Sequence, residues 1–418
     1  MTFPGRRLPS ADTPDPEDKD VMLMPDSARR LPRHCRPLTI LLVTWSLAVF
    51  AVEAPEPAAP AAPAAPAEVD GDFATAILID ADSGMVLAAK DPDVVRQPAS
   101  MLKMLTELIV LERVAEGDIH MDDLVTVSAR ASRMGGSQVY LAQGEEFTVG
   151  ELLAALAIQS ANDAAVALAE HTAGSVEAFV DLMNDRARRL GLQHSEFHTV
   201  HGLPPGRGQE PDLTTARDMA TIGRALLAFP EALGWASQST APFRDGAFTM
   251  YNPNKLVGQY RGLDGLKTGY HGQAGYCVTA TAVQKGVRLL SVVMGCSSDR
   301  ARATETTRLL SFGFNLYETV TLVDTAGAPT GQSVPVTDGK AAAVAANYAD
   351  PLEVNVPRDQ KDQVQLRYEF IAPLNAPVAA GEKVGEAVAV LGGHILGRVD
   401  LVAAATVEKG NWLNRLFH

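Results

Sequence analysis

Residues 97–106 read QPASMLKMLT, and this stretch decides the fold because it joins a reactive pair to the start of a helix. Apolar residues recur at helical spacing after Ser100, so the pattern predicts a helix over residues 100–115. Lys103 comes three residues after Ser100, which places the hydroxyl and the amine on one helical face. A desolvated lysine can take the proton of a serine hydroxyl and so activate it as a nucleophile. Alone the pattern is weak, because serine at a helix start is ordinarily an N-cap.

A polar triplet, Ser160-Ala161-Asn162, interrupts the apolar helical pattern over residues 149–172. In a functional interpretation Ser160 relays a proton beside Lys103, and Asn162 holds a substrate amide through its donor and acceptor. The alternative is a local break in the helix that is satisfied by internal hydrogen bonds.

A third element, Lys267-Thr268-Gly269, lies in the run GLDGLKTGY. Gly269 would let a substrate backbone approach a strand edge, while Lys267 and Thr268 would offer a cation and a hydroxyl to a carboxylate. The alternative is a solvated turn.

The three elements occur once each and in this order, with 60 residues from Ser100 to Ser160 and 107 from Ser160 to Lys267. This set resembles the Ser-x-x-Lys, Ser-x-Asn and Lys-Thr-Gly motifs of penicillin-binding proteins and serine β-lactamases. Four stretches are more narrowly similar to the low-molecular-mass D-alanyl-D-alanine carboxypeptidases, and the resemblance runs from about Asp72 to the C-terminus. The stretches are QPASMLKMLT, QSANDAAVALAE, HGLPPGRGQEPDLTTARDMA and DGLKTGY.

The resemblance implies a reaction on peptidoglycan stem peptides that end in D-Ala-D-Ala. Ser100 would attack the carbonyl of the penultimate D-alanine and form an acyl-enzyme. Lys103 would be the general base, and Ser160 would relay the proton to the leaving amine. β-Lactam antibiotics would then act as covalent inhibitors.

The same resemblance implies the binding groups. The oxyanion would lie between the backbone N–H groups of Ser100 and Tyr270, where many relatives have histidine in place of Tyr270. Asn162, Lys267, Thr268 and Gly269 would bind substrate. Arg302, in the run SDRARATET, would assist with the carboxylate or would be a solvated arginine at a helix start. His201 and Asn254 lie in recurrent stretches of the family and are interpreted as structural.

The order of patterns is strands, then helices, then strands, which predicts an α+β domain with an antiparallel sheet. A hairpin is expected over residues 72–90, further helices over 175–190, 214–229 and 301–312, and strands at 265–267, 276–282 and 288–294. Short alternating runs after residue 318 predict a small all-β domain. The expected limits are a polar and basic region (1–37), an apolar signal-peptide core or anchor (38–54), an Ala/Pro linker (55–71), a catalytic domain (72–318), a β-rich domain (319–408) and an amphipathic segment (409–418).

Both ends of the chain suggest a membrane-related location. A basic stretch leads into an uncharged apolar run of 15 residues, Leu38 to Val52, which is the length of a signal-peptide core and short of a bilayer span. We therefore expect export to the periplasm or the outer face of the cytoplasmic membrane. The terminal residues Trp412, Leu413, Leu416 and Phe417 form either an amphipathic membrane anchor or a frayed or packed end.

The amino-acid composition limits the classes of ligand and partner that the protein can bind. A formal net charge of -14 argues against nucleic-acid binding, which needs a basic surface. Cys277 and Cys296 lie in apolar runs and are expected to be buried thiols. No cluster of metal ligands and no phosphate-binding loop is recognisable, so we expect no cofactor and no metal.

Three other functions share these residues. A DD-endopeptidase would need the same groups and a wider groove. A class A β-lactamase would need a glutamate in the loop SEFHTVHGLPPGRGQ, which lacks the Glu-x-x-Leu-Asn arrangement; the nearest carboxylate is Glu196. A non-catalytic peptidoglycan-binding protein would be expected to have lost Ser100, Lys103 or Lys267, and all three are present.

Overall fold

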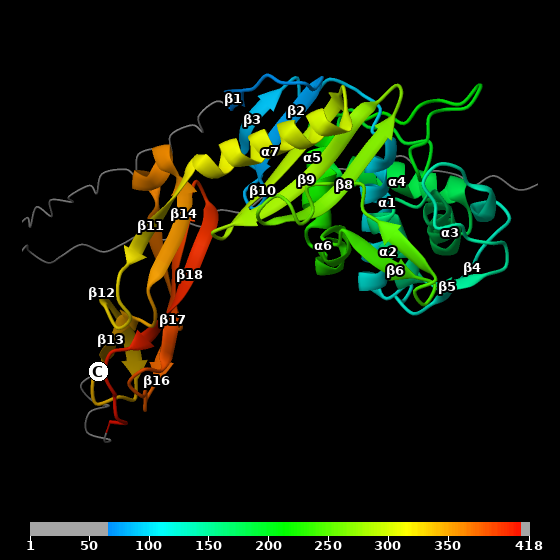
Figure 1. Ribbon diagram of the computed structural model, residues 1–418. Coiled ribbons are helices and arrows are strands. Elements are labelled where there is room, and N and C mark those ends of the chain that lie inside the picture. The colour runs from blue at the N-terminus through cyan, green and yellow to red at the C-terminus, as the bar shows by residue number, and fades with distance from the viewer. Residues whose placement is uncertain (1–65, 411–418) are drawn as a thin grey trace, which may run out of the picture. The chain divides into compact units, whose positions relative to one another are not determined.

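The structure is a computed structural model that describes residues 66–410. The expected export segment, and the terminal amphipathic segment from residue 411, lie outside the described residues. The described chain contains two six-stranded sheets and three two-stranded ones, with helices grouped along the first sheet (Figure 1).

The first sheet has the strand order β1-β3-β2-β10-β9-β8 and is antiparallel except where β1 joins β3. Its β2–β3 hairpin and its three later strands confirm the strands that the sequence predicts. β8 extends beyond the short strand expected there. The bounds are β1 (Ala67–Glu68), β2 (Thr75–Asp80), β3 (Val86–Lys90), β8 (Leu263–His271), β9 (Gly275–Gln284) and β10 (Val287–Cys296).

Side chains from the two faces of this sheet enter separate hydrophobic cores. Leu290 and Cys277 belong to the core beneath the main helical cluster, whereas Leu289 and Cys296 belong to the core under helix α7 (Asp299–Asn315). In Figure 1, α7 crosses the face of the sheet opposite to the other helices. Both cysteines are free and buried, as expected, and their side chains lie in different cores.

The remaining helices of this part form the cluster that packs around α1, which is almost entirely buried along its first nine residues. N-terminal caps explain where several of them begin: Thr148 starts α2 with a reciprocal capping box, and Ser175 and Thr215 cap α4 and α5. The bounds are η1 (Ala99–Leu102), α1 (Lys103–Glu116), η2 (Ala131–Arg133), α2 (Val149–Ile158), α3 (Asn162–Ala173), α4 (Val176–Leu190), α5 (Ala216–Leu226) and α6 (Pro230–Ala236).

The prediction of one helix over residues 149–172 is wrong, because the chain breaks between α2 and α3. Ser160 adopts a left-handed conformation with φ 62°, which a continuous helix cannot contain. The alternative of a local break is therefore confirmed for the backbone. Two short antiparallel strand pairs were not predicted: β4 (Leu124–Thr126) with β5 (Glu146–Thr148), and β6 (Thr240–Phe243) with β7 (Phe248–Tyr251).

The residues after α7 form strands and one 3₁₀ turn, which confirms the all-β prediction. One pair is β11-β14, and the second six-stranded sheet has the order β15-β17-β18-β13-β12-β16. A third core, rich in valine, lies among these strands. The bounds are β11 (Tyr317–Val323), β12 (Pro329–Thr337), β13 (Ala343–Tyr348), β14 (Leu352–Pro357), η3 (Arg358–Gln363), β15 (Gln365–Phe370), β16 (Leu374–Asn375), β17 (Lys383–Leu391) and β18 (His394–Ala403).

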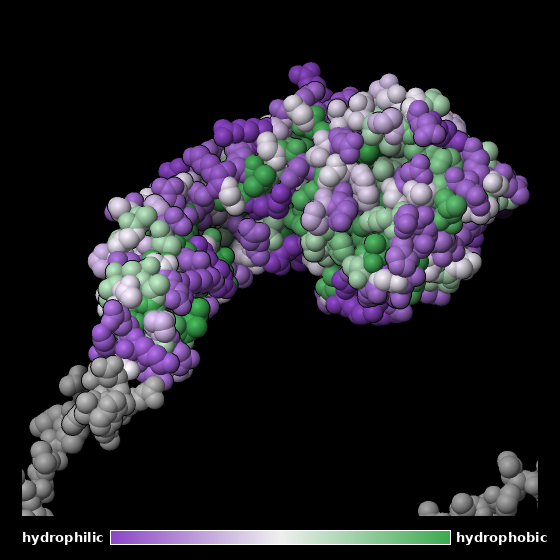
Figure 2. All heavy atoms as spheres, turned by 90° about the horizontal axis from the view of Figure 1, so that it is seen from below, coloured by the Kyte–Doolittle hydropathy of each residue, from purple (hydrophilic) through white to green (hydrophobic). Residues whose placement is uncertain are grey.

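The face drawn in Figure 2 is mostly hydrophilic, with small hydrophobic patches separated by polar side chains. Among the helices of residues 66–410, none has both the length and the apolar character needed to cross a membrane.

Candidate active site

Ser100 and Lys103 lie at the junction of η1 and α1, and their side chains meet. Lys103 Nζ is 2.9 Å from Ser100 Oγ and donates a second hydrogen bond of 2.7 Å to the backbone oxygen of His201. The predicted same-face arrangement is therefore confirmed. Ser100 is not an N-cap: it lies inside η1, whose capping residue is Pro98.

The Lys103 amine is fully buried, at 0% exposure. Burial lowers its pKa well below the usual value, and the nearby charge of Lys267 lowers it further, while Asp163 and Asp212 act in the opposite direction. A lowered pKa favours the free amine, whose electron pair can accept a proton. The geometry and the direction of the pKa shift together suit Lys103 to accept the Ser100 proton.

The loop that supplies the His201 carbonyl is tightly held. Asp212 accepts hydrogen bonds from the backbone of His198 and Thr199 and from the Thr199 hydroxyl. Gly202 has φ +74°, and a Cβ there would lie 2.1 Å from the backbone oxygen of Ala99. Only glycine lets this loop approach the residue before the nucleophile so closely.

The His201 side chain agrees with a structural interpretation. Its Nδ1 accepts a hydrogen bond of 3.1 Å from the Leu203 backbone N–H. Burial, and then the charge of Lys103, lower its pKa to about 3, so the imidazole is neutral. Asn254 likewise bonds within its own loop, through Oδ1 to the Leu256 backbone N–H, whereas its Nδ2 is buried without a partner among the described residues.

The Ser160 triplet presents polar atoms that its surroundings do not satisfy. Ser160 Oγ and Asn162 Oδ1 are buried and make no hydrogen bond to any residue of the described chain. Asn162 is fixed on its other side, because Nδ2 donates to the Gly135 backbone oxygen at 2.6 Å. Buried polar atoms without partners cost free energy and call for an explanation, which is often a functional one. The left-handed backbone at Ser160 also costs free energy, and strained conformations of this kind cluster at functional sites. The alternative of a break satisfied by internal hydrogen bonds therefore holds for Asn162 Nδ2 but is wrong for Ser160 Oγ and Asn162 Oδ1.

The Lys267-Thr268-Gly269 element runs along the edge strand β8. Lys267 is 2% exposed and Thr268 is 5% exposed, which excludes a solvated turn. Burial, with the positive charge of Arg302 adding to it, lowers the pKa of Lys267 to about 7, and Glu107 opposes this shift.

Gly269 brings β8 against η1. A Cβ at this position would lie 2.6 Å from the Pro98 backbone oxygen and 3.1 Å from the Met101 backbone nitrogen. The strand that carries Lys267 is thus in direct backbone contact with the turn that carries Ser100. The structure therefore unites the first and third sequence elements.

Tyr270 and Arg302 lie at the same end of β8. Tyr270 is 56% exposed, and its ring stacks on Tyr276 of β9, with ring centroids 4.1 Å apart. The Arg302 guanidinium lies 5.9 Å from the centre of the Tyr276 ring. It donates to the carboxylate of Asp299 and, at 3.3 Å, to the backbone oxygen of Cys277. Because Arg302 is only 6% exposed, the alternative of a solvated arginine is wrong.

Sequence reasoning did not single out Glu107, an ionisable group in this region. It comes four residues after Lys103 on α1 and is 3% exposed, and its Oε1 is buried without a partner among the described residues. The signal was available, because a carboxylate at this spacing falls on the buried face of a helix that is otherwise apolar.

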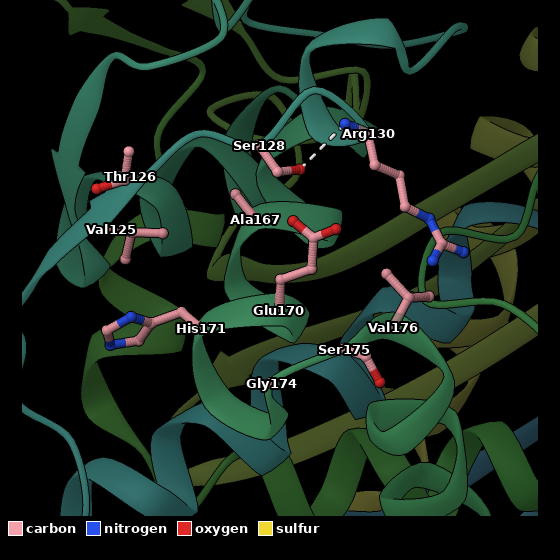
Figure 3. A pocket seen from close by; sticks show the side chains of 10 residues that line it. All are labelled: Val125, Thr126, Ser128, Arg130, Ala167, Glu170, His171, Gly174, Ser175 and Val176. Atoms are coloured by element: carbon pink, nitrogen blue, oxygen red, sulfur yellow. Dashed lines mark hydrogen bonds between the residues drawn. The ribbon is translucent and has the colours of Figure 1, made fainter.

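Figure 3 shows a pocket whose lining includes none of these residues. It contains no pair of nucleophile and base, and its polar groups include an ordinary turn in which the Arg130 backbone N–H donates to Ser128 Oγ. Within residues 66–410, no three His, Cys, Asp or Glu side chains are grouped as metal ligands would be. The pocket is lined by Val125, Thr126, Ser128, Arg130, Ala167, Glu170, His171, Gly174, Ser175 and Val176.

Comparison with known proteins identifies relatives of both parts of the chain. Residues 60–298 match the family model described as D-alanyl-D-alanine carboxypeptidase. Residues 317–409 match the model described as penicillin-binding protein 5, C-terminal domain. The chain is 34% identical over 381 residues to the D-alanyl-D-alanine carboxypeptidase DacF of Bacillus subtilis, which covers 90% of this chain and 94% of that protein. It is 36% identical over 351 residues to DacC of Escherichia coli, covering 82% and 86%.

Solved structures agree with these matches. Penicillin-binding protein 5 of Haemophilus influenzae has a TM-score of 0.59 at 32% identity and covers 82% of this chain and 99% of that one. The peptidoglycan synthesis regulatory factor PBP3 of Streptococcus pneumoniae has a TM-score of 0.68 at 26% identity, covering 81% and 100%. Penicillin-binding protein D2 of Listeria monocytogenes, solved in its ampicillin-bound form, has a TM-score of 0.54 at 29% identity, covering 59% and 99%.

Proposed function

Because this chain belongs to the D-alanyl-D-alanine carboxypeptidase family of serine peptidases, we propose that Ser100 is its nucleophile. The protein is a serine-type D-Ala-D-Ala carboxypeptidase, a penicillin-binding hydrolase that removes the terminal D-alanine from peptidoglycan stem peptides. The observation that supports Ser100 most strongly is its Oγ lying 2.9 Å from the buried amine of Lys103.

Acylation follows from this pair. The neutral Lys103 amine would take the hydroxyl proton while Ser100 Oγ bonds to the carbonyl carbon of the penultimate D-alanine. The tetrahedral oxyanion would be bound by the backbone N–H groups of Ser100 and Tyr270. The close approach of β8 to η1 at Gly269 supports this pairing, and such donors contribute about 3 kcal/mol each to the transition state.

Collapse of the intermediate breaks the peptide bond and needs a proton on the leaving amine. Ser160 would relay that proton from Lys103, and its unpartnered buried hydroxyl supports the role. Asn162 would accept a hydrogen bond from a substrate amide through its free Oδ1. Water would then hydrolyse the acyl-enzyme and regenerate Ser100.

The terminal carboxylate of the substrate would be bound by Lys267 and Thr268, with Gly269 allowing the substrate backbone to lie along β8. Arg302 would contribute mainly through its charge, since its guanidinium already donates to Asp299 and to backbone oxygens. Tyr270 would form an exposed aromatic wall beside the oxyanion site, where many relatives have histidine.

The proposal also covers the limits of the domains and the location of the protein in the cell. We place the catalytic domain at residues 72–318 and the β-rich domain at 319–408, which the two family matches support. The apolar segment 38–54 would direct export, and the linker 55–71 would tether the enzyme. The segment 409–418 would hold it on the outer face of the cytoplasmic membrane.

Neither alternative activity gains an observation in its favour. A class A deacylating glutamate would have to be near Ser100, but the Glu196 side chain is 67% exposed and lies 3.5 Å from His198 Nε2.

The test of the carboxypeptidase reaction uses the full chain and its Ser100→Ala variant with a stem peptide ending in D-Ala-D-Ala. Release of free D-alanine should disappear in the variant. Cleavage of crosslinked dimers without D-alanine release from monomers would overturn the assignment in favour of an endopeptidase.

A further inference from the structure

The carboxylate-binding end of β8 is tied to the loop of residues 251–255. The Arg302 guanidinium donates to the backbone oxygen of Cys277 at 3.3 Å and to that of Pro253 at 3.2 Å. Cys277 is the residue of β9 that pairs with Gly269 of β8. Arg302 therefore connects the strand that would bind the substrate carboxylate with this loop.

One carboxylate, that of Asp299, is shared between two cations at this end of the site. Its Oδ1 accepts a hydrogen bond from Arg302, and its Oδ2 lies 2.5 Å from the amine of Lys255, a residue of the loop. The Lys255 side chain is 70% exposed, that of Asp299 is 29% exposed, and that of Arg302 is 8% exposed. The three side chains thus form a row of charges that leads from solvent to the buried guanidinium.

Helix geometry accounts for the position of Asp299 but not for its pairing with Lys255. Asp299 is the first residue of α7 and follows the N-cap Ser298, where a carboxylate is favourable beside the helix dipole. It also comes three residues before Arg302, so these two side chains meet on one helical face. Lys255 is 44 residues from Asp299 in the chain, so their ion pair depends on the packing of the loop against α7.

The loop backbone is held by hydrogen bonds of its own. Asn252 Nδ2 donates to the backbone oxygens of Ala236 and Gln238, both at 3.0 Å. Asn252 Oδ1 accepts from the Asn254 backbone N–H at 2.9 Å. The Lys255 side chain therefore extends from a backbone that is fixed in place.

The sum of these charges matters because the whole chain is acidic, with a formal net charge of -14. Such a protein repels anionic ligands unless its binding site is locally positive. Arg302 and Asp299 alone would be a neutral pair, whereas two cations and one carboxylate leave one positive charge. Among the described residues, Asp299 is the one acid that forms an ion pair with Arg302, since Glu305 on the next turn pairs with Arg308.

We propose that Lys255 offsets the charge of Asp299, so that the Arg302 end of the site stays positive and steers substrates with a free carboxylate into it. This inference rests on the proposed binding of the substrate carboxylate at β8 beside Arg302. Lys255 touches no substrate atom in this account; it is a positioning residue that acts through Asp299 and Arg302. Steering of this kind raises the rate of association and falls with ionic strength.

The experiment is the rate constant of acylation by benzylpenicillin, whose carboxylate stands for that of the terminal D-alanine. It is measured at about 0.01 M and about 1 M ionic strength, where charges act over about 30 Å and about 3 Å. The comparison ligand is benzylpenicillin methyl ester, which lacks the carboxylate and should not be steered.

Lys255→Met in the full chain removes the charge and keeps the apolar part of the side chain. At the lower ionic strength we expect its acylation rate with benzylpenicillin to be about three- to fivefold below wild type. At the higher ionic strength the two enzymes should react alike, because the charges are screened. With the methyl ester they should react alike at both ionic strengths.

Three further variants test the sum of charges. Asp299→Asn keeps an oxygen to which Arg302 can donate and adds one positive charge to the group, so the rate at low ionic strength should rise. Combining it with Lys255→Met restores the wild-type sum, and the rate should return to within about twofold of wild type. Lys285→Met is the matched control: it changes the charge of the whole chain equally, but Lys285 follows the far end of β9, roughly 25 Å along the strand from Cys277. Its rate should equal that of wild type.

The steering role would be overturned if Lys255→Met reacted like wild type at low ionic strength, or lost the same factor at both ionic strengths or with the ester. An equal loss in Lys285→Met, or a slower Asp299→Asn, would overturn it as well. A wild-type enzyme that penicillin does not acylate would instead overturn the proposed function of Ser100. The acylated fraction reports folding and the rate constant reports the site, so partial misfolding does not obscure these outcomes.

Discussion

The contact between β8 and the nucleophile turn makes Gly269→Ala an informative perturbation. The added Cβ would lie 2.6 Å from the Pro98 backbone oxygen, 3.1 Å from the Met101 backbone nitrogen and 3.2 Å from the Ala99 Cβ. Two of these three atoms belong to backbone, and the Met101 N–H donates to the Pro98 oxygen within the same turn. No flexible side chain can move aside, so β8 and η1 must separate.

Separating β8 from η1 should affect both the stability of the protein and its catalytic rate. Overpacking a rigid contact costs about 1–3 kcal/mol of stability, which lowers the melting temperature by several degrees. Catalysis should suffer more, because the oxyanion donors at Ser100 and Tyr270 lie on the two elements that are forced apart. Loss of alignment of one oxyanion donor lowers the rate on the order of 10²-fold. We therefore expect slow acylation in a protein that is still folded.

The assay is the acylation rate with a fluorescent penicillin, measured beside thermal unfolding. Gly272→Ala is the matched control, since a Cβ at that nearby glycine would meet nothing within 4 Å. Gly272→Ala should acylate at the wild-type rate. If Gly269→Ala does so as well, β8 does not supply part of the oxyanion site and the geometric reasoning is refuted.

Two further predictions concern the base and the helix that ends before Ser160. Acylation of the wild type should slow as pH falls, because protonation of Lys103 removes the electron pair that accepts the Ser100 proton. Lys103→Met should lose this acid limb and react about 10²–10⁴ times more slowly, and a wild-type rate at neutral pH would contradict the role. Thr148→Ala removes the capping box of α2, in which Thr148 Oγ1 accepts from the Glu151 N–H at 3.2 Å. Urea unfolding should show a loss of about 1 kcal/mol, and an unchanged unfolding midpoint would argue against a stabilising cap.

The sequence was sufficient to predict the class of fold and the pairing of Ser100 with Lys103. Helical periodicity fixes which side chains share a face, and the observed 2.9 Å between Nζ and Oγ confirms that inference. Runs of apolar residues bounded by turn residues were equally sufficient to predict the central strands. These signals are local, so they can be read without knowing the tertiary contacts.

The break at Ser160 could not be read in this way. Residues 149–172 carry an apolar helical pattern on both sides of the triplet, and periodicity does not register one residue with a left-handed backbone. Its conformation depends on contacts made elsewhere, including the Asn162 backbone N–H, which donates to Ser137 at 2.8 Å. The short strands β4 to β7 escaped prediction because three or four residues hold too little alternation.

Packing between distant elements is also invisible to a linear pattern. Glu107 and Lys267 are 160 residues apart in the chain, and the sequence does not reveal that the helix of the glutamate packs against β8. The burial of Arg302 was hidden in the same way, because it depends on the packing of α7 against β9.

The most direct test of the central claim is to locate the covalent adduct. Full-length protein would be acylated with a penicillin, digested, and analysed by mass spectrometry for the modified residue. The account predicts a single adduct on the peptide that contains Ser100, absent from Ser100→Ala. An adduct on Ser160 or on any other residue, or labelling that survives Ser100→Ala, would contradict it.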